Sequence, residues 1–416
     1  MPAEEFYSRP TICLDKLPDE LLGEVLRHAT WVPYGIHPSD LVASRMQSSE
    51  AVENQKDYIH SLVTKRYLIR VCKRWHRLAF LYLYEWVLVS RLKNLKGLIT
   101  AVERRLFDDP ERASVGRVTR RLEIDFRWTG REGVDELRQI NILLPSLLQS
   151  LVELEILVIG DCFEVQWMNP WVSHTLCPKV RYLNWVAPQV RPIFKHWINF
   201  LQSHPNLIGI NPPEGMSLNR ITPIQLSHPQ ITAWTTTSTD PVVPKVFPSL
   251  RRLSVVFHFG KLDERWGERL ITQPLLSLEI LQLNVFYPTH KLTVDTMLET
   301  IQPLYRFMPH LRRVELVLLS WNAPETWSRY APPASVSVLG VRVRSTRPKK
   351  QAVKHLLQIL RGIVQSTPRL KIQFTDEGTL RPILKEEEYL VRCAKEGKII
   401  ERWLDHEGCE YRLPVE

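Results

Sequence analysis

The stretch PSLRRLSV, residues 248–255, holds the pattern that decides the fold. Its proline marks a turn, because the proline ring fixes the backbone angle that the second position of a turn requires. Leu250 follows, and Leu253 and Val255 come three and five residues after it. The alternation over the last three residues predicts a short strand with one buried face. The stretch therefore predicts a turn that leads into a strand.

The same pattern returns along the middle of the chain, with prolines at positions 178, 205, 229, 248 and 309 and a weaker copy at 368. The first anchors of the copies are Thr119, Leu154, Val180, Leu207, Ile231, Leu250, Leu278, Leu311, Val336 and Leu370. Successive anchors are 19 to 35 residues apart, with a mean of about 28, which is the upper end of the range for leucine-rich repeats. Residues 91–375 therefore resemble a leucine-rich-repeat body.

This resemblance implies an α/β fold, a right-handed solenoid of short parallel strands with helical returns. Helices are predicted at 134–149, 193–201, 294–307 and 353–364 from their apolar periodicity. An ordinary α/β domain, in which strands and helices alternate without forming a solenoid, remains the alternative. Residues 376–416 are predicted to be a charged cap or tail, because a terminal repeat needs a polar outer face.

Two segments near the N-terminus predict helices: LPDELL at residues 17–22 and VCKRW at residues 71–75. The first places Leu21, Leu22, Val25 and Leu26 on one helical face. Pro18 stands in the first turn, where its missing N–H costs nothing. The second segment is predicted to open another amphipathic helix at Val71, with a basic opposite face.

Together and in this order, the two segments resemble the F-box, a helical module that docks onto the Skp-family adaptor of cullin-RING ubiquitin ligases. The apolar run after Glu85 resembles the end of the divergent F-boxes that are common in fungi. The predicted module covers residues 12–90, with an inserted loop at about 33–60. The residues that the resemblance assigns to adaptor contact are Leu17, Pro18, Leu22, Val25, Leu26, Val71, Cys72 and Trp75.

The composition is that of an ordinary folded protein of 416 residues, long enough for two to three domains. No apolar run is long enough to span a bilayer, and the acidic N-terminus lacks a signal core. The six cysteines are scattered without a Cys-x-x-Cys pair, which indicates reduced thiols. We therefore expect a cytoplasmic or nuclear protein that has no contact with a membrane.

The positive charge of the chain is concentrated in the predicted repeats. Lys plus Arg minus Asp plus Glu is 16 − 14 = +2 for residues 1–110, 32 − 20 = +12 for 111–375 and 7 − 11 = −4 for 376–416. A basic body favours acidic partners. Adjacent arginines at 251–252 and 312–313 are predicted to align along one edge, which would suit a phosphorylated or acidic peptide, or a nucleic-acid backbone.

The sequence shows no pattern for catalysis, a metal or a cofactor: it lacks a glycine-rich phosphate loop, the HExxH zinc motif and a nucleophile elbow. The resemblance instead implies a non-catalytic subunit that tethers an unknown client, acidic or phosphorylated by hypothesis, to the adaptor and its cullin. The candidate client face comprises the predicted solvent-facing strand residues Glu123, Asn184, Ser254, Gln282, Glu315 and Arg342. The alternatives are an F-box scaffold outside a ligase and, less favoured, a basic solenoid that binds nucleic acid.

Overall fold

The computed structural model describes residues 16–30, 32, 48–108, 114–126, 134–160, 177–185, 192–213, 216, 228–237, 245–257, 265–285, 301–318, 332–343, 350–367, 369–374 and 403–404. The helices are α1 (Asp19–Thr30), α3 (Ser48–Val71), α4 (Lys73–Glu85), α5 (Leu92–Asp108), α6 (Val115–Val118), α7 (Val134–Ser150), α9 (Phe194–Ser203), α10 (Arg265–Thr272), the 3-10 helix η4 (Gln302–Phe307) and α12 (Lys350–Ser366). The strands are β1 (Trp86–Val89), β2 (Arg121–Ile124), β3 (Ile156–Ile159), β4 (Tyr182–Trp185), β5 (Gly209–Asn211), β6 (Ala233–Thr237), β7 (Arg252–Phe257), β8 (Ile280–Val285), β9 (Arg313–Leu318), β10 (Val338–Val343), β11 (Lys371–Phe374) and β12 (Trp403–Leu404).

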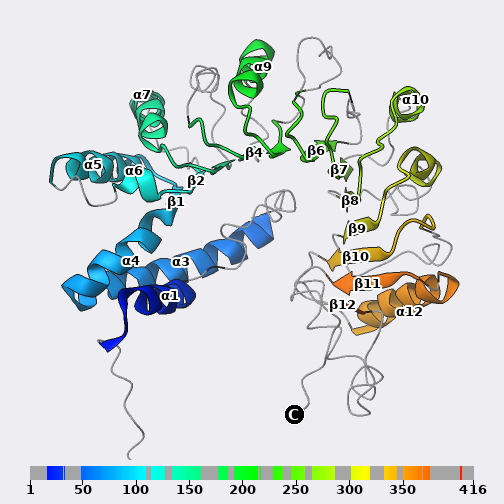
Figure 1. Cartoon of the computed structure of the whole chain (residues 1–416), viewed down its shortest axis with the longest axis horizontal. Helices are drawn as coiled ribbons and strands as arrows, with labels where there is room; N and C mark the ends of the chain where they lie inside the picture. Colours follow the sequence, from blue (N-terminus) through cyan, green and yellow to red (C-terminus); the bar gives the residue numbers. More distant parts are fainter. Residues whose placement is uncertain are drawn as a thin grey trace, which may run out of the picture.

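Within the described residues, the twelve strands form one sheet in which each strand pairs with the next strand along the chain. These pairings are parallel, from β1 with β2 to β11 with β12. The sheet curves into an arch whose inner side is lined by strands, and helices α5, α7, α9, α10 and α12 lie on the outer side (Figure 1). The fold is therefore α/β and solenoid-like, with short parallel strands as the repeat pattern predicts.

The proline turns explain why each strand begins where it does. The anchor residue donates its backbone N–H to the carbonyl three residues earlier: Val180 to Cys177 at 3.0 Å, Leu250 to Phe247 at 3.2 Å and Leu311 to Met308 at 3.1 Å. The proline occupies the second position of each of these turns. All ten predicted anchors are buried. Each of these three proline turns is thus a β-turn that sets the register of the following strand.

The core is one continuous cluster between the sheet and the outer returns. The second and third apolar positions of each repeat point into it, as Leu253 and Val255 do in β7. Large aromatic side chains, including Trp185 and Trp234, fill the space between successive coils. Each coil buries its apolar face against its neighbours, which is the arrangement that gives a repeat protein its stability.

Three of the predicted return helices correspond to α7, α9 and α12. Residues 294–300 of the fourth lie outside the described residues, and its end forms the 3-10 helix η4. The sheet is longer than residues 91–375, because β1 precedes this range and β12 follows it. The cap predicted for residues 376–416 otherwise lies outside the described residues.

Helices α1, α3 and α4 lie at the β1 end of the arch (Figure 1). The predicted loop at 33–60 is partly wrong, because helix α3 already begins at Ser48. A buried aromatic contact joins the helices to the sheet: the rings of Tyr58 and Trp86 are 4.6 Å apart between centroids. The Tyr58 hydroxyl donates to the Trp86 carbonyl at 3.2 Å and accepts from the Leu88 N–H at 3.2 Å. We call this contact the Tyr58–Trp86 joint.

We expect Leu278→Ala to destabilise the repeat body, because this anchor is fully buried and its truncation leaves a cavity. Such substitutions cost about 2–5 kcal/mol. The matched control is Leu276→Ala, two residues away on the same coil, whose side chain is 58% exposed. Urea unfolding followed by circular dichroism measures both variants. Equal midpoints for the two variants would contradict the assignment of Leu278 as an anchor.

Candidate functional site

The first helix begins at the Leu17–Pro18 segment that the sequence pattern predicts as a helix start. The Leu22 N–H donates to the Pro18 carbonyl at 2.9 Å, so the first helical hydrogen bond ends on the proline. Pro18 itself is exposed and Leu17 is half-buried. The chain thus presents the proline at the surface, while Leu22 and Leu26 of α1 lie inward.

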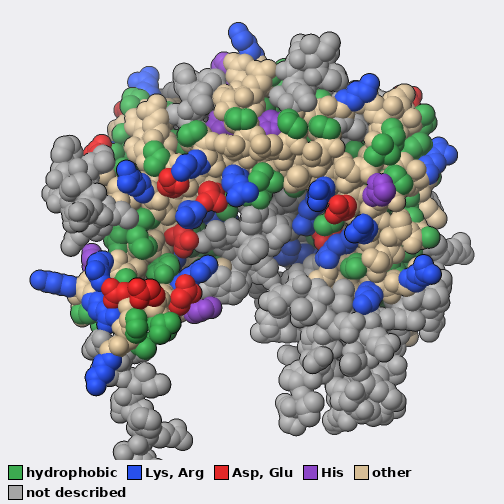
Figure 2. Space-filling model, in the orientation of Figure 1, with side chains coloured by type: hydrophobic (Ala, Val, Ile, Leu, Met, Phe, Trp, Pro, Cys, Tyr) green, Lys and Arg blue, Asp and Glu red, His purple; other side chains and the backbone are tan. Residues whose placement is uncertain are grey.

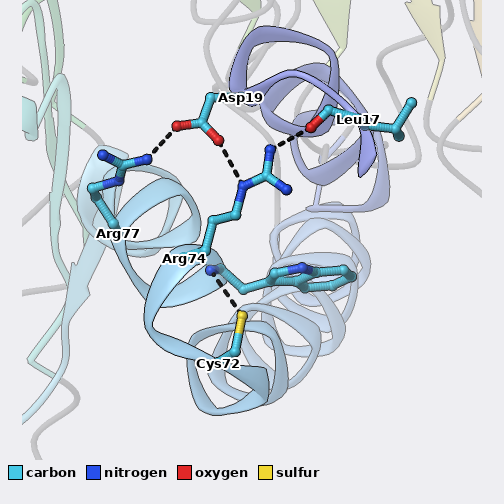
Figure 3. A network of polar contacts seen from close by, with 6 residues as sticks. Leu17, Asp19, Cys72, Arg74 and Arg77 are labelled. Carbon is cyan, nitrogen blue, oxygen red and sulfur yellow. Dashed lines mark hydrogen bonds and ion pairs between the residues drawn. The ribbon is translucent and has the colours of Figure 1, made fainter. Parts of the chain in front are cut away.

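A polar network fixes the start of α1 against α4 (Figure 3). The Arg74 Nε donates to Asp19 Oδ1 at 2.7 Å, and the same guanidinium donates to the Leu17 carbonyl. Arg77 pairs with the second carboxylate oxygen of Asp19. The hydrogen bond from Arg74, together with the charges of both arginines, lowers the pKa of Asp19 below its usual value. One carboxylate at the helix start therefore holds two arginines from the other helix.

The corner between α3 and α4 differs from the prediction that a helix opens at Val71. Val71 is the last residue of α3, and α4 begins at Lys73. Cys72 stands between them as the N-cap, with its Sγ accepting from the Trp75 N–H at 3.5 Å. The exposed side chains of Val71 and Cys72 therefore lie at a helix junction and not along one helical face.

Leu22 and Leu26 have an internal role that the resemblance did not assign to them. Both are buried with Ala79 in a small cluster between α1 and α4, with Trp75 packed against it. In this structure they hold the helices together and are unavailable to a partner, so the expectation of direct contact is corrected for these two. Sequence periodicity placed them on the apolar face, but only the packing shows that this face is already covered.

Two rows of exposed apolar side chains remain on the helices. On α1, Leu21 and Val25 are 55% and 44% exposed. On α3, four exposed residues follow one another at intervals of four, which places them along one side of the helix: Ile59, Val63, Tyr67 and Val71. We call these the α1 row and the α3 row. The α3 row was not predicted from the sequence, because part of its helix was taken for a loop.

The predicted client residues lie on the inner side of the arch, but most are buried. Strand pairing puts Ser254 beside Gln282 and Gln282 beside Glu315, while Arg342 lies in the next row beside Val317. The remaining two, Glu123 and Asn184, lie on either side of Val158 in the same row. Asn184, Ser254, Gln282 and Glu315 are at most 7% exposed, so the prediction that they face solvent is wrong. Neighbouring strands about 4.8 Å apart on a curved sheet shield the shorter side chains between them.

Glu315 is the centre of an arginine cluster on this inner side. Arg252 donates to its Oε2 at 3.0 Å and Arg313 donates to its Oε1 at 2.6 Å, and the charge of Arg342 also acts on it. Burial raises the pKa of Glu315, but the charges of Arg252 and Arg313 outweigh that effect and leave the pKa below its usual value. Glu315 is thus a buried carboxylate that holds two guanidinium groups and feels the charge of a third, Arg342; we call these three arginines the arginine cluster.

A second, smaller group lies at the other end of the sheet. Arg121 donates from Nε to Glu123 Oε1 at 2.8 Å, and its guanidinium stacks over Trp86 at 4.2 Å from the ring centroid. Figure 2 shows basic and acidic side chains together along the inner edge of the arch near β1 to β4 and again near β7 to β10. The inner side therefore carries two charged groups, separated by the apolar cluster of Ile156, Val158 and Tyr182.

Lys65 is a buried lysine inside the helical module. Its side chain is 4% exposed, and burial lowers its pKa to about 8 although Glu85 opposes the change. Burial in turn raises the pKa of Glu85, against the attraction of Lys65. The pair places opposite charges in the contact between α3 and α4.

No helix in the described ranges is both long and apolar enough to cross a lipid bilayer. In the same ranges, no three His, Cys, Asp or Glu side chains come together in a group that could hold a metal ion.

No known protein family and no curated protein matches this chain. Among solved structures, a Bacteroides fragilis protein from a structural genomics consortium is 14% identical, with a TM-score of 0.35, over 74% of this chain and 76% of that one. The TLR13–ssRNA13 complex is 13% identical, with a TM-score of 0.21, over 73% of this chain and 62% of that one. At these scores neither likeness bears on the function of this chain.

We expect Asp19→Asn to loosen α1 from α4, because both arginines lose their charged partner. Amide hydrogen exchange of α1 at pH 7 should become faster, while the control Glu20→Gln, an exposed neighbour with the same charge change, should match the wild type. Since the pKa of Asp19 is lowered in the folded chain, its stabilisation is present above the usual pKa and is lost as the pH falls through the folded pKa. Equal exchange in the two variants would contradict the proposed role.

We expect Lys65→Met to stabilise the chain at pH 7 by about 1–3 kcal/mol, because folding no longer buries an ammonium group. The gain should shrink as the pH rises from about 8 towards 10, where folded Lys65 is already neutral. In that window the unfolded wild type still binds the proton, so wild-type stability rises relative to the variant. Urea midpoints at about pH 7, 8.5 and 9.5 measure this difference. The exposed-lysine control, Lys73→Met, should show no pH-dependent difference in stability from the wild type. A gain for Lys65→Met that stays constant across these pH values would overturn the explanation.

Proposed function

We propose that this chain is the substrate-recognition subunit of a cullin-RING ubiquitin ligase, an F-box protein that tethers a client to the Skp-family adaptor without catalysing a reaction. The observation that carries the proposal is the combination of two surfaces that are joined without a linker. Helices α1 and α3 expose apolar rows at one end, and a curved parallel sheet offers an inner side with charged groups beside them. The body is proposed to be a right-handed, leucine-rich-repeat-like solenoid.

The adaptor contact is proposed to involve the exposed members of the set that the resemblance assigns: Pro18, Val25, Val71 and Cys72, with Leu17 and Trp75 at the margin. The α1 and α3 rows add apolar area to this surface. Exposed apolar patches on a folded protein mark places where another protein binds. Leu22 and Leu26 support the contact indirectly, because they hold α1 in place.

Tethering requires that the two surfaces keep a fixed separation. Helix α4 ends at Glu85 and β1 begins at Trp86, so no linker separates the helices from the sheet. The Tyr58–Trp86 joint and Phe80, which belongs to the main core, fasten the helices to the first coil. A client on the inner side of the arch would therefore be held at a constant distance from the adaptor, which raises its effective concentration near the ubiquitin-loaded enzyme.

We expect Val25→Asp to weaken capture of a Skp-family adaptor by about 10- to 100-fold, because burying a valine-sized side chain is worth about 1.5–3 kcal/mol. The matched control is Val152→Asp in the repeat body, since Val152 is 43% exposed and Val25 is 44% exposed. Titration of purified adaptor onto immobilised chain measures both variants. Equal binding by the two variants would remove α1 from the interface, and no binding by the folded wild type would end the proposal.

The same capture experiment separates a ligase subunit from a scaffold. When adaptor and cullin are supplied together, we expect the cullin to be retained with the wild-type chain and to be lost with Val25→Asp. Retention of the adaptor without the cullin would instead favour an F-box scaffold that acts outside a ligase.

A further inference from the structure

We propose that the arginine cluster on the inner side of β7 to β10 binds an anionic side chain, a phosphate or a carboxylate, of an extended client segment that lies across the strands. This inference deepens the proposed function, because it assigns the chemistry of the client contact. It stands on the charge balance of the cluster and on buried polar atoms that lack partners. The two observations are independent of each other.

The described inward residues of β7 to β11 carry more basic than acidic side chains. Strand pairing places Arg252, Ile280 and Arg313 in one row, and Lys371 continues that row through Val338. Glu315 and Arg342 follow on the next two inward positions of β9 and β10. Four basic groups thus accompany one carboxylate, a net charge of 4 − 1 = +3 on the described inward residues of β7 to β11.

Glu315 pairs with two of these arginines. Its two carboxylate oxygens each accept from a different arginine, Oε2 from Arg252 and Oε1 from Arg313. The Arg252 Nε is buried and finds no acceptor among the described residues. A buried cationic donor without an acceptor is costly, and natural proteins keep such groups mainly where something else satisfies them. A planar guanidinium pair held at fixed positions suits a phosphate or carboxylate, which accepts two bonds at once.

Polar atoms without hydrogen-bond partners, three amide oxygens and one hydroxyl, accompany the cluster on the same side of the sheet. Asn211 Oδ1 in β5, Thr235 Oγ1 in β6, and Gln282 Oε1 and Asn284 Oδ1 in β8 are buried and have no partner within the part of the chain that the structure describes. The Asn211 Nδ2 donates to the Trp185 carbonyl, which identifies Oδ1 as the free acceptor of that amide. Strand pairing gives these positions the same inward orientation as Ser254 and Glu315.

A ligand that fits must therefore supply an anion at β7 to β10 and hydrogen-bond donors both at β8 and towards β5. A peptide has both, since its backbone N–H groups are donors and an acidic or phosphorylated side chain is an anion. A nucleic-acid backbone offers phosphates but few donors, so it fits only the arginines. From β5 to β9 the span is about 19 Å at ~4.8 Å per strand, which about six extended residues cover at ~3.3 Å each.

The test uses the full chain and fluorescently labelled seven-residue alanine peptides whose central residue is phosphoserine, glutamate or serine. Fluorescence anisotropy measures binding to the wild type and to two matched pairs of variants. Arg252→Gln is paired with Arg251→Gln, and Arg313→Gln with Arg312→Gln. Each pair removes the same charge from adjacent positions, but only the first member of each pair removes a contact to Glu315.

We expect the phosphoserine or the glutamate peptide to bind the wild type, and the serine peptide to bind at least about tenfold more weakly, because charge-assisted hydrogen bonds are lost. The peptide that binds more tightly shows whether the anion of the client is a phosphate or a carboxylate. Arg252→Gln and Arg313→Gln should weaken that binding by about tenfold or more, and Arg251→Gln and Arg312→Gln by about twofold at most. Equal losses within a pair would show attraction by net charge alone and would overturn the site.

Glu315→Gln keeps the inference testable if an arginine variant fails to fold. Glutamine keeps a carbonyl oxygen that can still position an arginine but removes the competing negative charge, so the anionic peptide should bind about threefold more tightly or better. Unchanged or weaker binding by a folded Glu315→Gln chain would contradict the proposal. Circular dichroism and urea midpoints establish that each variant is folded.

A single strand of about 20 nucleotides of mixed sequence provides the competing outcome. If it binds, and all four arginine variants weaken it equally while no peptide binds, the inner side is a nucleic-acid surface and the inference is overturned. Adaptor capture is measured separately on the same samples. Loss of peptide binding with adaptor capture intact would refute only this inference, whereas peptide binding without adaptor capture would refute the proposed function and leave the anion site.

Discussion

The requirement that parallel strands be joined by long returns shapes the whole molecule. A parallel neighbour cannot be reached by a tight turn, so each strand must leave the sheet, cross its outer side and come back. The buried anchors make this possible, because each proline turn ends on a residue that inserts between adjacent coils, as Leu250 and Leu311 do. The returns vary in length, but the anchors stay in register. Every surface of functional interest is built on that register.

The helices depend on the same sheet for their position. The Tyr58–Trp86 joint lies where α3 contacts the first strand, and the guanidinium of Arg121 in β2 stacks on the same tryptophan ring. One tryptophan at the start of β1 therefore contacts the helical module and the second coil together. Through this contact, the helices with the exposed α1 and α3 rows are packed directly against the end of the arch (Figure 1).

The candidate sites show how far residue patterns can be followed. Alternation correctly placed Glu315 and Gln282 on the side of the strand opposite the core, and the doubled arginines were recognised as a feature of one edge. Their burial could not be predicted, because it arises from side chains on neighbouring strands that are far apart in the sequence. Arg252 and Glu315 are 63 residues apart in the sequence. Their side chains meet because the sheet leaves only one strand, β8, between β7 and β9. The α3 row was missed for a different reason: the first part of its helix was taken for an inserted loop.

The sequence by itself determined the repeat, its anchors, the parallel strands and the absence of a recognisable catalytic motif, because these follow from local chemistry: a proline turn, an apolar alternation and the spacing between copies. It also determined the helix start at Pro18 and the apolar face behind it. The tertiary structure alone decided which apolar residues are buried by packing and which remain exposed. Leu22 is buried, for example, while Val25 on the same helix is exposed. It likewise decided which charges meet. The exposure of a side chain and the pairing of two charged side chains both depend on residues from several coils. They are therefore decided only when strands that are distant in the sequence pair in register.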